Sequence, residues 1–307
     1  MNEFVKKKKD NEILVTVFTP TFNRGYIIKS LYESLKRQTL KDFEWVVIDD
    51  GSTDNTEELF RIFKDEHNTF DISYEKVING GKHRAINKGV KKARGKLFFI
   101  VDSDDYLTDD AIEKIIELEA TIPNEKKDTF AGVCECKGYN KNEIIGKTYL
   151  AEGYLDITML EREKYGIYGD KAEVFYTEIL KKYPFPAFEG ENFLTECVVW
   201  DKIAYDGYKL RFDNNVIYIC DYLPDGLTAH YEELYDKNPA GYGLYIYQSG
   251  VFGKIRGIEK WKEYYHYYNK FKSRIGLKKT AEYLHMNMFI LLFRMFGIKA
   301  FLKIYDK

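Results

Sequence analysis

The sequence predicts an α/β fold in which a mostly parallel, Rossmann-like sheet is flanked by helices. Short apolar runs rich in β-branched and aromatic residues alternate with segments of helical periodicity. That alternation is typical of βαβ units with right-handed crossovers. Polar or acidic residues follow each apolar run, and the carboxyl ends of parallel strands lie at the edge of the sheet where ligands bind.

The predicted strands are short apolar runs, at residues 13–18, 43–48, 72–77 and 97–101. Such runs are too short for buried helices and suit strands that are covered on both faces. The first run meets Thr19-Pro20, where the proline is expected to end the strand. The predicted helices are residues 27–38, 55–63, 82–92 and 110–122.

The run at residues 97–101 leads directly into three carboxylates, Asp102, Asp104 and Asp105. Clustered carboxylates beside a buried strand repel one another and are poorly solvated, so a cationic partner is expected. A hard divalent metal with oxygen ligands is the natural candidate. For this short motif alone, a solvated turn before the next helix is the commoner explanation. Four strand ends with small, polar or acidic residues at one edge favour a ligand site instead.

The composition indicates a packed chain without a global nucleic-acid signature. The 307 residues are 45% hydrophobic and carry a net charge of −2, so no nucleic-acid partner is expected. The four cysteines include no second pair with zinc spacing, which favours free or buried thiols in a reducing compartment. The first residues lack the apolar run of a signal peptide, and no stretch reaches about 18 uninterrupted apolar residues. We therefore expect a cytoplasmic protein, at most resting on the inner face of the cell membrane.

Four motifs occur in an order and spacing that resemble those of a known family. They are TPTFNR (19–24), DDGSTDNT (49–56), NGGKxxAxNxG (79–89) and VDSDD (101–105). Together they resemble the serial motifs of glycosyltransferase family 2, with a GT-A fold, as in bacterial capsular and exopolysaccharide enzymes. The resemblance implies a nucleotide-sugar donor, expected to be a UDP-sugar, and Mn²⁺ or Mg²⁺ as cofactor. It covers residues 15–122 clearly and continues less tightly to residue 225.

The resemblance also implies roles for single residues. Phe22 falls where such enzymes place an aromatic against the base, because stacking needs only a π face; a core position is the alternative. Asp50 resembles the carboxylate that accepts from the base or ribose, whereas Asp49 is expected to hold its own loop by accepting backbone N–H bonds. The other implied donor contacts are Pro20, Thr21, Asn23, Arg24, Gly80, Gly81, Lys82, Asp102 and Ser103. A surface cation is the alternative for Arg24, and a solvated lysine after a plain turn is the alternative for Lys82.

The metal site is expected at the acidic turn. Asp102 and Asp104 match the Asp-x-Asp pattern that holds the cation on the donor diphosphate, and Asp105 is a further candidate ligand. The metal would neutralise charge that builds on the leaving nucleoside diphosphate. His230 is a candidate ligand of the metal or the diphosphate, although a lone histidine more often has a structural role.

An inverting transfer also requires a base for the acceptor hydroxyl. The family supplies it from a downstream acidic pair, and the comparable segment here is residues 188–204. Glu196, on a helix expected from about residue 193, is the predicted base and Glu191 the second choice. Cys197 stands where the family usually has Asp, and a thiol with a pKa of about 8.5 is a poor replacement. An ordinary helix acid is the alternative for Glu196.

We expect residues 1–225 to form the catalytic domain, with a nucleotide-sugar-binding half at 1–122 and an acceptor half at 123–225. Residues 226–307 are expected to form a helical C-terminal extension. Candidate acceptor contacts are 168–171, the aromatic segment 183–186 and Trp200, each with core packing as the alternative. The apolar stretch 283–304, interleaved with Arg and Lys, predicts an amphipathic helix that contacts a membrane, packs on the catalytic domain or joins a homodimer.

The sequence therefore predicts an inverting, metal-dependent hexosyltransferase that acts on a saccharide or lipid-linked saccharide. One alternative is a polyprenyl-phosphate glycosyl synthase, which shares the donor motifs but usually needs only half this length or carries spanning helices. A second alternative is a non-catalytic nucleotide-sugar-binding subunit, which Cys197 favours. The sugar, the acceptor and the linkage depend on a few hydrogen bonds that no motif records.

Overall fold

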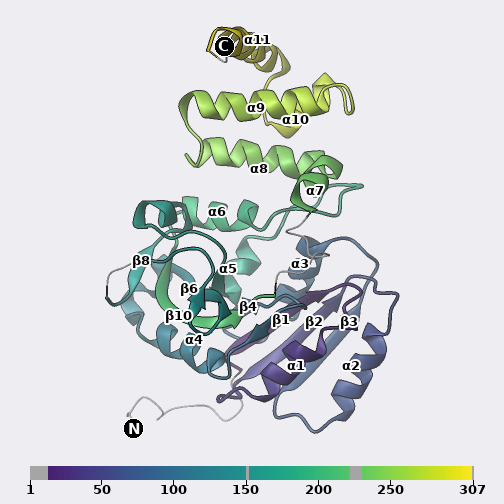
Figure 1. The fold of residues 1–307 in the computed structure, drawn as a ribbon, viewed down its shortest axis with the longest axis vertical. Helices are drawn as coiled ribbons and strands as arrows, with labels where there is room; N and C mark the ends of the chain where they lie inside the picture. The colour runs from purple at the N-terminus through teal and green to yellow at the C-terminus, as the bar shows by residue number, and fades with distance from the viewer. Residues whose placement is uncertain (1–12, 150–151, 222–229, 306–307) are drawn as a thin grey trace.

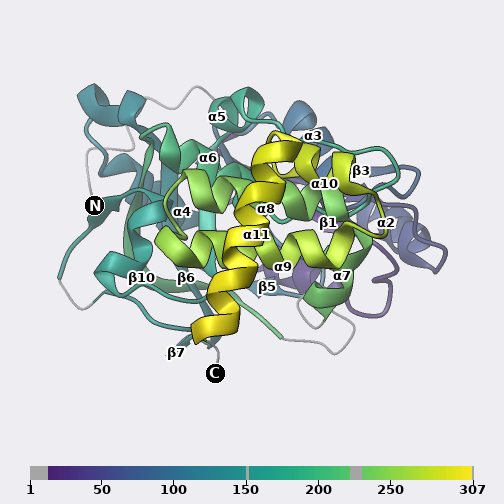
Figure 2. The same ribbon diagram turned by 90° about the horizontal axis from the view of Figure 1, so that it is seen from above.

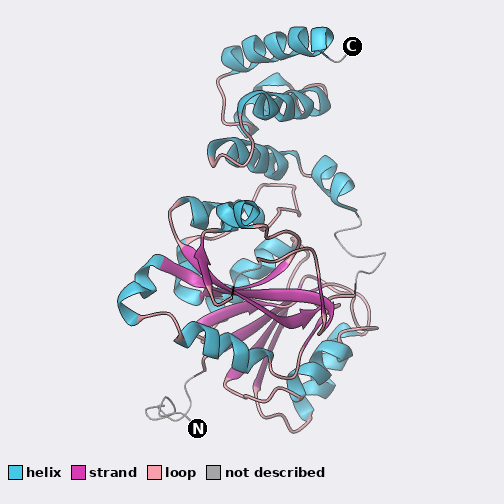
Figure 3. Ribbon diagram, turned by 60° about the vertical axis from the view of Figure 1, so that its left-hand side comes forward, coloured by secondary structure: helices cyan, strands magenta, loops and turns pink. Residues whose placement is uncertain are grey.

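The computed structural model describes residues 13–149, 152–221 and 230–305. Within these ranges, ten strands form one sheet. They are β1 (Val15–Thr21), β2 (Phe43–Asp49), β3 (Asp71–Lys76), β4 (Leu97–Ile100), β5 (Tyr106–Leu107), β6 (Phe130–Asn140), β7 (Glu143–Ile144), β8 (Leu155–Ile157), β9 (Lys171–Tyr176) and β10 (Lys209–Ile219). Helices cover both faces of the sheet (Figures 1 and 3).

The helices fall into two groups along the chain. Those of the sheet region are α1 (Lys29–Lys36), α2 (Thr56–Asp65), α3 (Lys82–Lys92), α4 (Ala111–Ala120), α5 (Thr177–Lys182) and α6 (Cys197–Tyr205), with 3-10 turns at Asn124–Thr129 and Met159–Tyr165. Those that follow the sheet are α7 (Tyr231–Lys237), α8 (Pro239–Val251), α9 (Gly257–Phe271), α10 (Leu277–Tyr283) and α11 (Met288–Tyr305).

The strand order is β3-β2-β1-β4-β9-β6-β10-β5, with β7 beside β6 and β8 beside β10. Strands β1 to β4 run parallel to one another, whereas β9 is antiparallel to both β4 and β6. The predicted α/β class is confirmed, and the sheet is mixed because antiparallel pairs dominate beyond β4. The parallel half gathers the carboxyl ends of β1, β2 and β4 at one edge.

Each central strand is buried on both faces, which explains why its sequence is a continuous apolar run. Val17 and Trp45 belong to the core under α1, α2 and α4, whereas Phe18 and Val46 belong to the core under α3, α5 and α6. Helix α3 lies close to β1, because a Cβ at Gly89 would meet the Phe18 ring at 2.2 Å. Because α3 packs closely on β1 at Gly89, its first residue, Lys82, lies near the carboxyl ends of the parallel strands.

The predicted elements agree with the structure except in three places. The single helix expected at residues 283–304 is divided between α10 and α11, which are bent by 91°, because the chain turns between them at His285 with φ 49°. Strand β1 does not end before Pro20, which pairs in register with Ile48 of β2. Proline is tolerated there because β4 pairs with β1 only as far as Phe18. The backbone of residue 20 faces the β4 side, as that of Phe18 does, and β4 offers no partner there for an N–H group. The helix expected from about residue 193 begins at Cys197, and Glu196 is its N-cap.

The C-terminal helices stack above α6 on the side away from β1 to β3 (Figure 1). They have a core of their own, to which Tyr264, Phe271 and Leu291 belong. Seen from above, α11 crosses over α8 and α9 (Figure 2). Within the three described ranges, no helix by itself is long and apolar enough to cross a membrane; α10 and α11 pass that test only as a pair bent by 91°.

Candidate active site

A pocket of about 1360 Å³ opens at the carboxyl ends of the parallel strands. It brings together most of the residues singled out in the sequence, from five separate segments. Those that line it are Pro20, Thr21, Phe22, Asn23, Arg24, Asp50, Gly81, Lys82, Asp102, Ser103, Asp104, Asp105 and Glu196. Gly80, Glu191 and His230 lie outside its lining.

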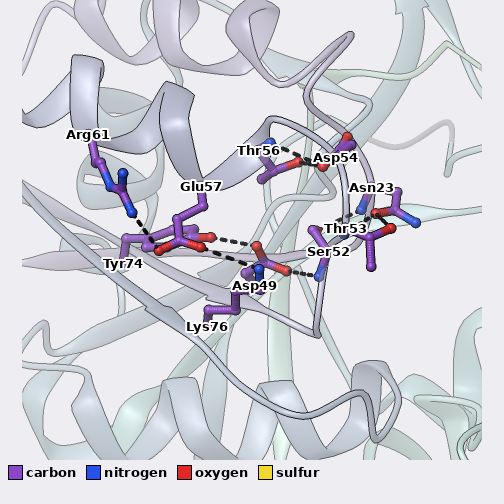
Figure 4. Close-up of polar contacts among 10 residues, drawn as sticks. All are labelled: Asn23, Asp49, Ser52, Thr53, Asp54, Thr56, Glu57, Arg61, Tyr74 and Lys76. Carbon is purple, nitrogen blue, oxygen red and sulfur yellow. Dashed lines mark hydrogen bonds and ion pairs between the residues drawn. The ribbon is translucent and has the colours of Figure 1, made fainter.

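The loops after β1 and β2 are fastened to each other (Figure 4). The Ser52 N–H donates to Asp49 Oδ1 at 2.7 Å, which is the loop-holding role predicted for Asp49. The Asn23 N–H donates to Ser52 Oγ, and Asn23 Oδ1 accepts from the Thr53 N–H. Asn23 has φ 53°, a left-handed conformation that asparagine tolerates. Asn23 therefore joins the two loops, in addition to the donor contact predicted for it.

Phe22 is 46% exposed at the pocket wall, so the core position considered for it is wrong. The neighbouring Thr21 is buried, and its hydroxyl has no hydrogen-bond partner among the described residues. A buried hydroxyl without a partner costs free energy that a bound polar ligand would recover. An exposed aromatic face at the pocket wall suits a flat group such as a nucleobase.

Asp50 holds the glycine turn before α3. Its two carboxylate oxygens accept from the N–H groups of Gly80 and Gly81, each at 2.8 Å. Burial raises the pKa of the Asp50 carboxyl, against the lowering effect of these two bonds. The predicted contact with a base or ribose thus falls on a carboxylate whose oxygens already accept two bonds, and each oxygen keeps a free lone pair.

Lys82 lies between the acidic turn and the predicted base. Its Nζ is 2.7 Å from Asp102 Oδ1 and 2.8 Å from Glu196 Oε1. Burial alone would lower the pKa of Lys82, but the charges of Asp102 and Glu196 outweigh it and raise that pKa well above its usual value. Burial likewise would raise the pKa of Asp102, and Lys82 holds it below its usual value. The lysine is therefore a permanent cation in contact with both acids, and not a solvated side chain.

The other two carboxylates of the turn are less well neutralised. Arg24 lies 3.8 Å from Asp104, and burial together with the Asp102 charge raises the pKa of Asp104. Asp105 accepts from the Tyr218 hydroxyl at 2.7 Å. Burial and the Asp102 charge raise the pKa of Asp105 to about 7. Both shifts have the sign expected of carboxylates that lack enough positive charge nearby.

This donor set fits a hard divalent cation. No group of three or more metal-binding side chains is ready to hold an ion in the part of the chain that is described. Mg²⁺ usually takes only one or two carboxylates and completes its shell with water and substrate phosphates. Asp102 and Asp104 lie on one turn and match that requirement. The pKa of Asp104 is raised, and the charge of Lys82 is the main cause that keeps the pKa of Asp102 low, so both carboxylates would gain from a nearby cation. The metal would therefore be expected together with a phosphate-bearing ligand.

Two predicted residues lie elsewhere. Glu191 accepts from the N–H groups of Ala240 and Gly241 at 2.6 and 2.9 Å, so its carboxylate caps α8, and it does not line the pocket. His230 is about half exposed, and its Nδ1 lies 3.9 Å from Glu233. The structure does not bring either residue to the acidic turn, and their catalytic and metal roles stay predictions.

The candidate acceptor contacts differ in whether they reach the pocket. Residues 168–171 and Trp200 line it, whereas Phe185 is buried in the core against Trp200 and offers no platform for a sugar. Cys197 also lines the pocket, and burial raises the pKa of its thiol. It therefore cannot replace the missing acid at neutral pH. Cys134, Cys136 and Cys220 are free as well.

Two residues of the site carry no signal in the sequence. The Tyr218 hydroxyl accepts from the Asp102 N–H at 2.8 Å while it donates to Asp105, so β10 supports the acidic turn. Lys137 on β6 lines the pocket with its Nζ 4.1 Å from the Tyr218 ring centroid. Burial would lower the pKa of Lys137, but the charge of Asp102 raises it. Alternation along a strand predicts which face of the sheet a side chain lies on, but it does not predict that Lys137 and Tyr218 lie near the acidic turn.

Comparison with known proteins places these residues in a family. Residues 16–164 match the model of the glycosyl transferase family 2 domain. Glycosyltransferase GlyG of Streptococcus pneumoniae serotype 4 is 31% identical over 44% of this chain and 42% of its own length. Glycosyltransferase GlyA of the same organism is 31% identical over 70% of this chain and 30% of its own length. The chain thus spans less than half of each of these relatives.

Solved structures show the same fold at low sequence identity. S. aureus TarS 1-349 in complex with UDP-GlcNAc superimposes with a TM-score of 0.57 at 18% identity, over 89% of this chain and 79% of that one. The mannosyltransferase PcManGT from Pyrobaculum calidifontis, in complex with GDP-Man and Mn²⁺, gives a TM-score of 0.54 at 18% identity, over 98% and 80% of the two chains. The motifs, the matched domain and the arrangement of the sheet agree, and residues 16–164 of the chain form a glycosyl transferase family 2 domain with a GT-A fold.

Proposed function

We propose that the protein is an inverting, metal-dependent glycosyltransferase that moves a hexosyl unit from a nucleotide sugar to a hydroxyl group of a surface polysaccharide or lipid-linked oligosaccharide. A UDP-sugar is the proposed donor, in line with the UDP-GlcNAc complex of TarS, whose fold is similar. The observation that carries the proposal is the contact of one cation, Lys82, with both the acidic turn and Glu196. In this proposal the donor diphosphate and the acceptor hydroxyl bind on either side of the Lys82 ammonium.

In this proposal Phe22 stacks on the base and the Asp50 carboxylate accepts from the base or ribose. Asp102 and Asp104 would hold Mg²⁺ or Mn²⁺, which when bound neutralises the charge of the leaving diphosphate. Lys82 and Arg24 lie where they add positive charge to the same phosphates. Glu196 Oε1 accepts the proton of the acceptor hydroxyl, so that the oxygen attacks the anomeric carbon from the face opposite to the departing diphosphate.

The domain assignment is part of the proposal. Residues 1–225 supply the catalytic machinery, with the donor half at 1–122 and the acceptor half at 123–225, and residues 226–307 form the helical extension. The described pocket draws on both halves, since Asp102 and Glu196 line it together, and Tyr231 and Lys254 of the extension also line it.

The enzymatic proposal is tested by measuring UDP release from a panel of UDP-sugars with Mn²⁺. We expect metal-dependent release by the wild type, and loss of about 100-fold or more in kcat for Glu196→Gln, with UDP affinity retained. Glu189→Gln, which changes an exposed acid in the same segment, serves as control. Metal-dependent binding without any UDP release would favour the non-catalytic binding subunit. Normal turnover of Glu196→Gln would remove Glu196 as the base.

We also propose that α11 contacts a membrane near the acceptor. Phe289, Phe293 and Phe296 are 73 to 77% exposed at the end of the helical stack farthest from the sheet (Figure 1), while Leu291 and Met295 on the same helix are buried. The charged residues of α11 are all cations, Arg294, Lys299 and Lys303. Apposed copies of this helix would repel each other, whereas an anionic lipid surface attracts it.

Co-sedimentation with vesicles tests the membrane contact. We expect binding to phosphatidylglycerol vesicles and little binding to phosphatidylcholine, and we expect the double substitution Phe293→Ser with Phe296→Ser to abolish it. Tyr139→Ser, at an exposed aromatic outside the helical stack, is the matched control. Equal binding of the double variant would refute the contact. A dimer that the double substitution converts to a monomer would identify the face as a homodimer interface instead.

A further inference from the structure

Glu196 stands at the end of a segment without regular structure, residues 183–196, that depends on other elements for its position. One set of contacts comes from α3. The Arg84 guanidinium donates to the carbonyl oxygens of Glu191 at 2.5 Å and Phe188 at 2.7 Å. It also donates to the carbonyl of Gly80. Gly80 and Gly81 form the glycine turn before α3, which is called the donor turn below. Arg84 therefore fastens this segment to the turn that Asp50 holds.

The second set of contacts comes from the start of α8, in the C-terminal extension. Asn238, the N-cap residue of α8, accepts with Oδ1 from the N–H groups of Asn192 at 2.9 Å and Phe193 at 3.1 Å. The buried Glu191 carboxylate accepts from the first turn of α8, at Ala240 and Gly241. Four hydrogen bonds thus join three consecutive residues of the segment to one helix end. The segment donates two of them and the helix donates the other two.

The donor turn and this segment pack closely against each other. Gly81 has φ +95°, and a Cβ there would lie 1.8 Å from the Asn192 carbonyl oxygen. The donor turn and Asn192 therefore approach each other closely, with no room for a side chain between them. A continuous path of contacts runs from Asp50 through Gly81 and Asn192 to the first turn of α8.

We propose that Asn238 and Glu191 are positioning residues through which the C-terminal helices fix the Glu196 carboxylate beside Lys82 and the acidic turn. The inference rests on the proposed role of Glu196 as base. It gives the extension a part in catalysis that is separate from any membrane contact of α11. It also explains why Glu191 is an acid next to the pocket without lining it: its charge is used by two backbone N–H groups at a helix N-terminus, where a carboxylate is favourable.

The test removes the tether at Asn238 without changing any charge. Asn238→Ala loses both bonds to residues 192–193, and we expect kcat to fall by about 10- to 100-fold, since displacing a catalytic group by about 1 Å has effects of that size. The donor KM should change less than about twofold, because the donor turn keeps its bonds to Asp50. Asn238→Asp keeps the oxygen that accepts from residues 192–193 but loses the Nδ2 bond to the Leu234 carbonyl, so it should recover part of the kcat that Asn238→Ala loses. Asn287→Ala is the matched control, because Asn287 caps α11 in the same extension and does not line the pocket.

Hydrogen exchange gives a readout that does not depend on turnover. The amides of residues 191–196 should exchange at least about tenfold faster in Asn238→Ala than in Asn287→Ala, with exchange in β1 to β4 unchanged. Unchanged exchange would show that the tether does not hold the segment. Faster exchange with wild-type kcat would show that the segment does not need to be held, and either result overturns the proposal. A wild type that never turns over would refute the proposed function, while the exchange result would still decide whether the tether exists.

Discussion

Lys82→Met is expected to tighten metal binding while it weakens nucleotide binding. In the structure the lysine ammonium lies 2.7 Å from Asp102 and 2.8 Å from Glu196, so a divalent ion held by Asp102 would compete with it for the same carboxylate. A metal can bind only after the ammonium moves away, and the lysine then gives up two charge-assisted hydrogen bonds. Methionine has a similar length and no charge, so the variant has no bonds of this kind to break.

The size of the effect follows from those two bonds. A hydrogen bond to a charged group contributes about 1.5 to 3 kcal/mol, and the three side chains are 22 to 31% exposed, which favours the lower end of that range. Two such bonds at the lower end contribute about 3 kcal/mol, and screening by solvent reduces the cost of displacing the lysine to about 1.5 to 3 kcal/mol. Its absence should raise the Mn²⁺ affinity of the variant by about 10- to 100-fold.

The assay is a titration with Mn²⁺ in the absence of nucleotide, followed by the electron paramagnetic resonance signal of free Mn²⁺. UDP affinity without metal should fall in the same variant, since a cation that would face the phosphates is missing. Lys92→Met, which removes a lysine paired with Glu75 at the other end of α3, should change neither value. An Mn²⁺ affinity for Lys82→Met equal to that of the wild type would refute the view that lysine and metal compete for Asp102.

Two further predictions concern the nucleobase and the pH dependence of stability. Phe22→Ala should weaken UDP binding by about 1 to 3 kcal/mol, measured by isothermal titration calorimetry, and unchanged affinity would exclude a stacking role. His83 is buried, and burial lowers its pKa to about 4. The unfolded chain binds this proton more tightly than the folded one, so stability should fall as pH decreases from about 6.5 towards 4. Between pH 7 and pH 5 the wild type should lose about 2 kcal/mol more than His83→Gln in urea unfolding, and parallel losses would contradict the buried neutral imidazole.

The parallel half of the fold can be predicted because its signals are local. Helix α3 has the bounds that the sequence predicts, Lys82–Lys92, since a glycine turn starts it and apolar spacing continues it. The same local rules are wrong at Pro20, because whether a strand tolerates proline depends on how far the neighbouring strand continues. Sequence patterns record the strand itself and not where its neighbour ends.

The site is predictable where one motif carries a whole turn, and not where contacts join distant segments. The three carboxylates of the acidic turn are visible in the sequence, but Tyr218, which donates to Asp105, is 113 residues away. Likewise, nothing local distinguishes Glu191 from Glu196. Only the position of α8 shows that Glu191 caps a helix while Glu196 faces Lys82. Long-range packing, which no short window contains, decides such roles.

The central claim, that the acidic turn holds a cation which in turn holds the donor diphosphate, is tested most directly by one calorimetric comparison. UDP is titrated into the wild type and into Asp104→Asn, with and without Mn²⁺. The claim predicts that Mn²⁺ raises the UDP affinity of the wild type by at least about tenfold, and that the substitution removes this increase. A UDP affinity that is the same with and without Mn²⁺ would contradict it.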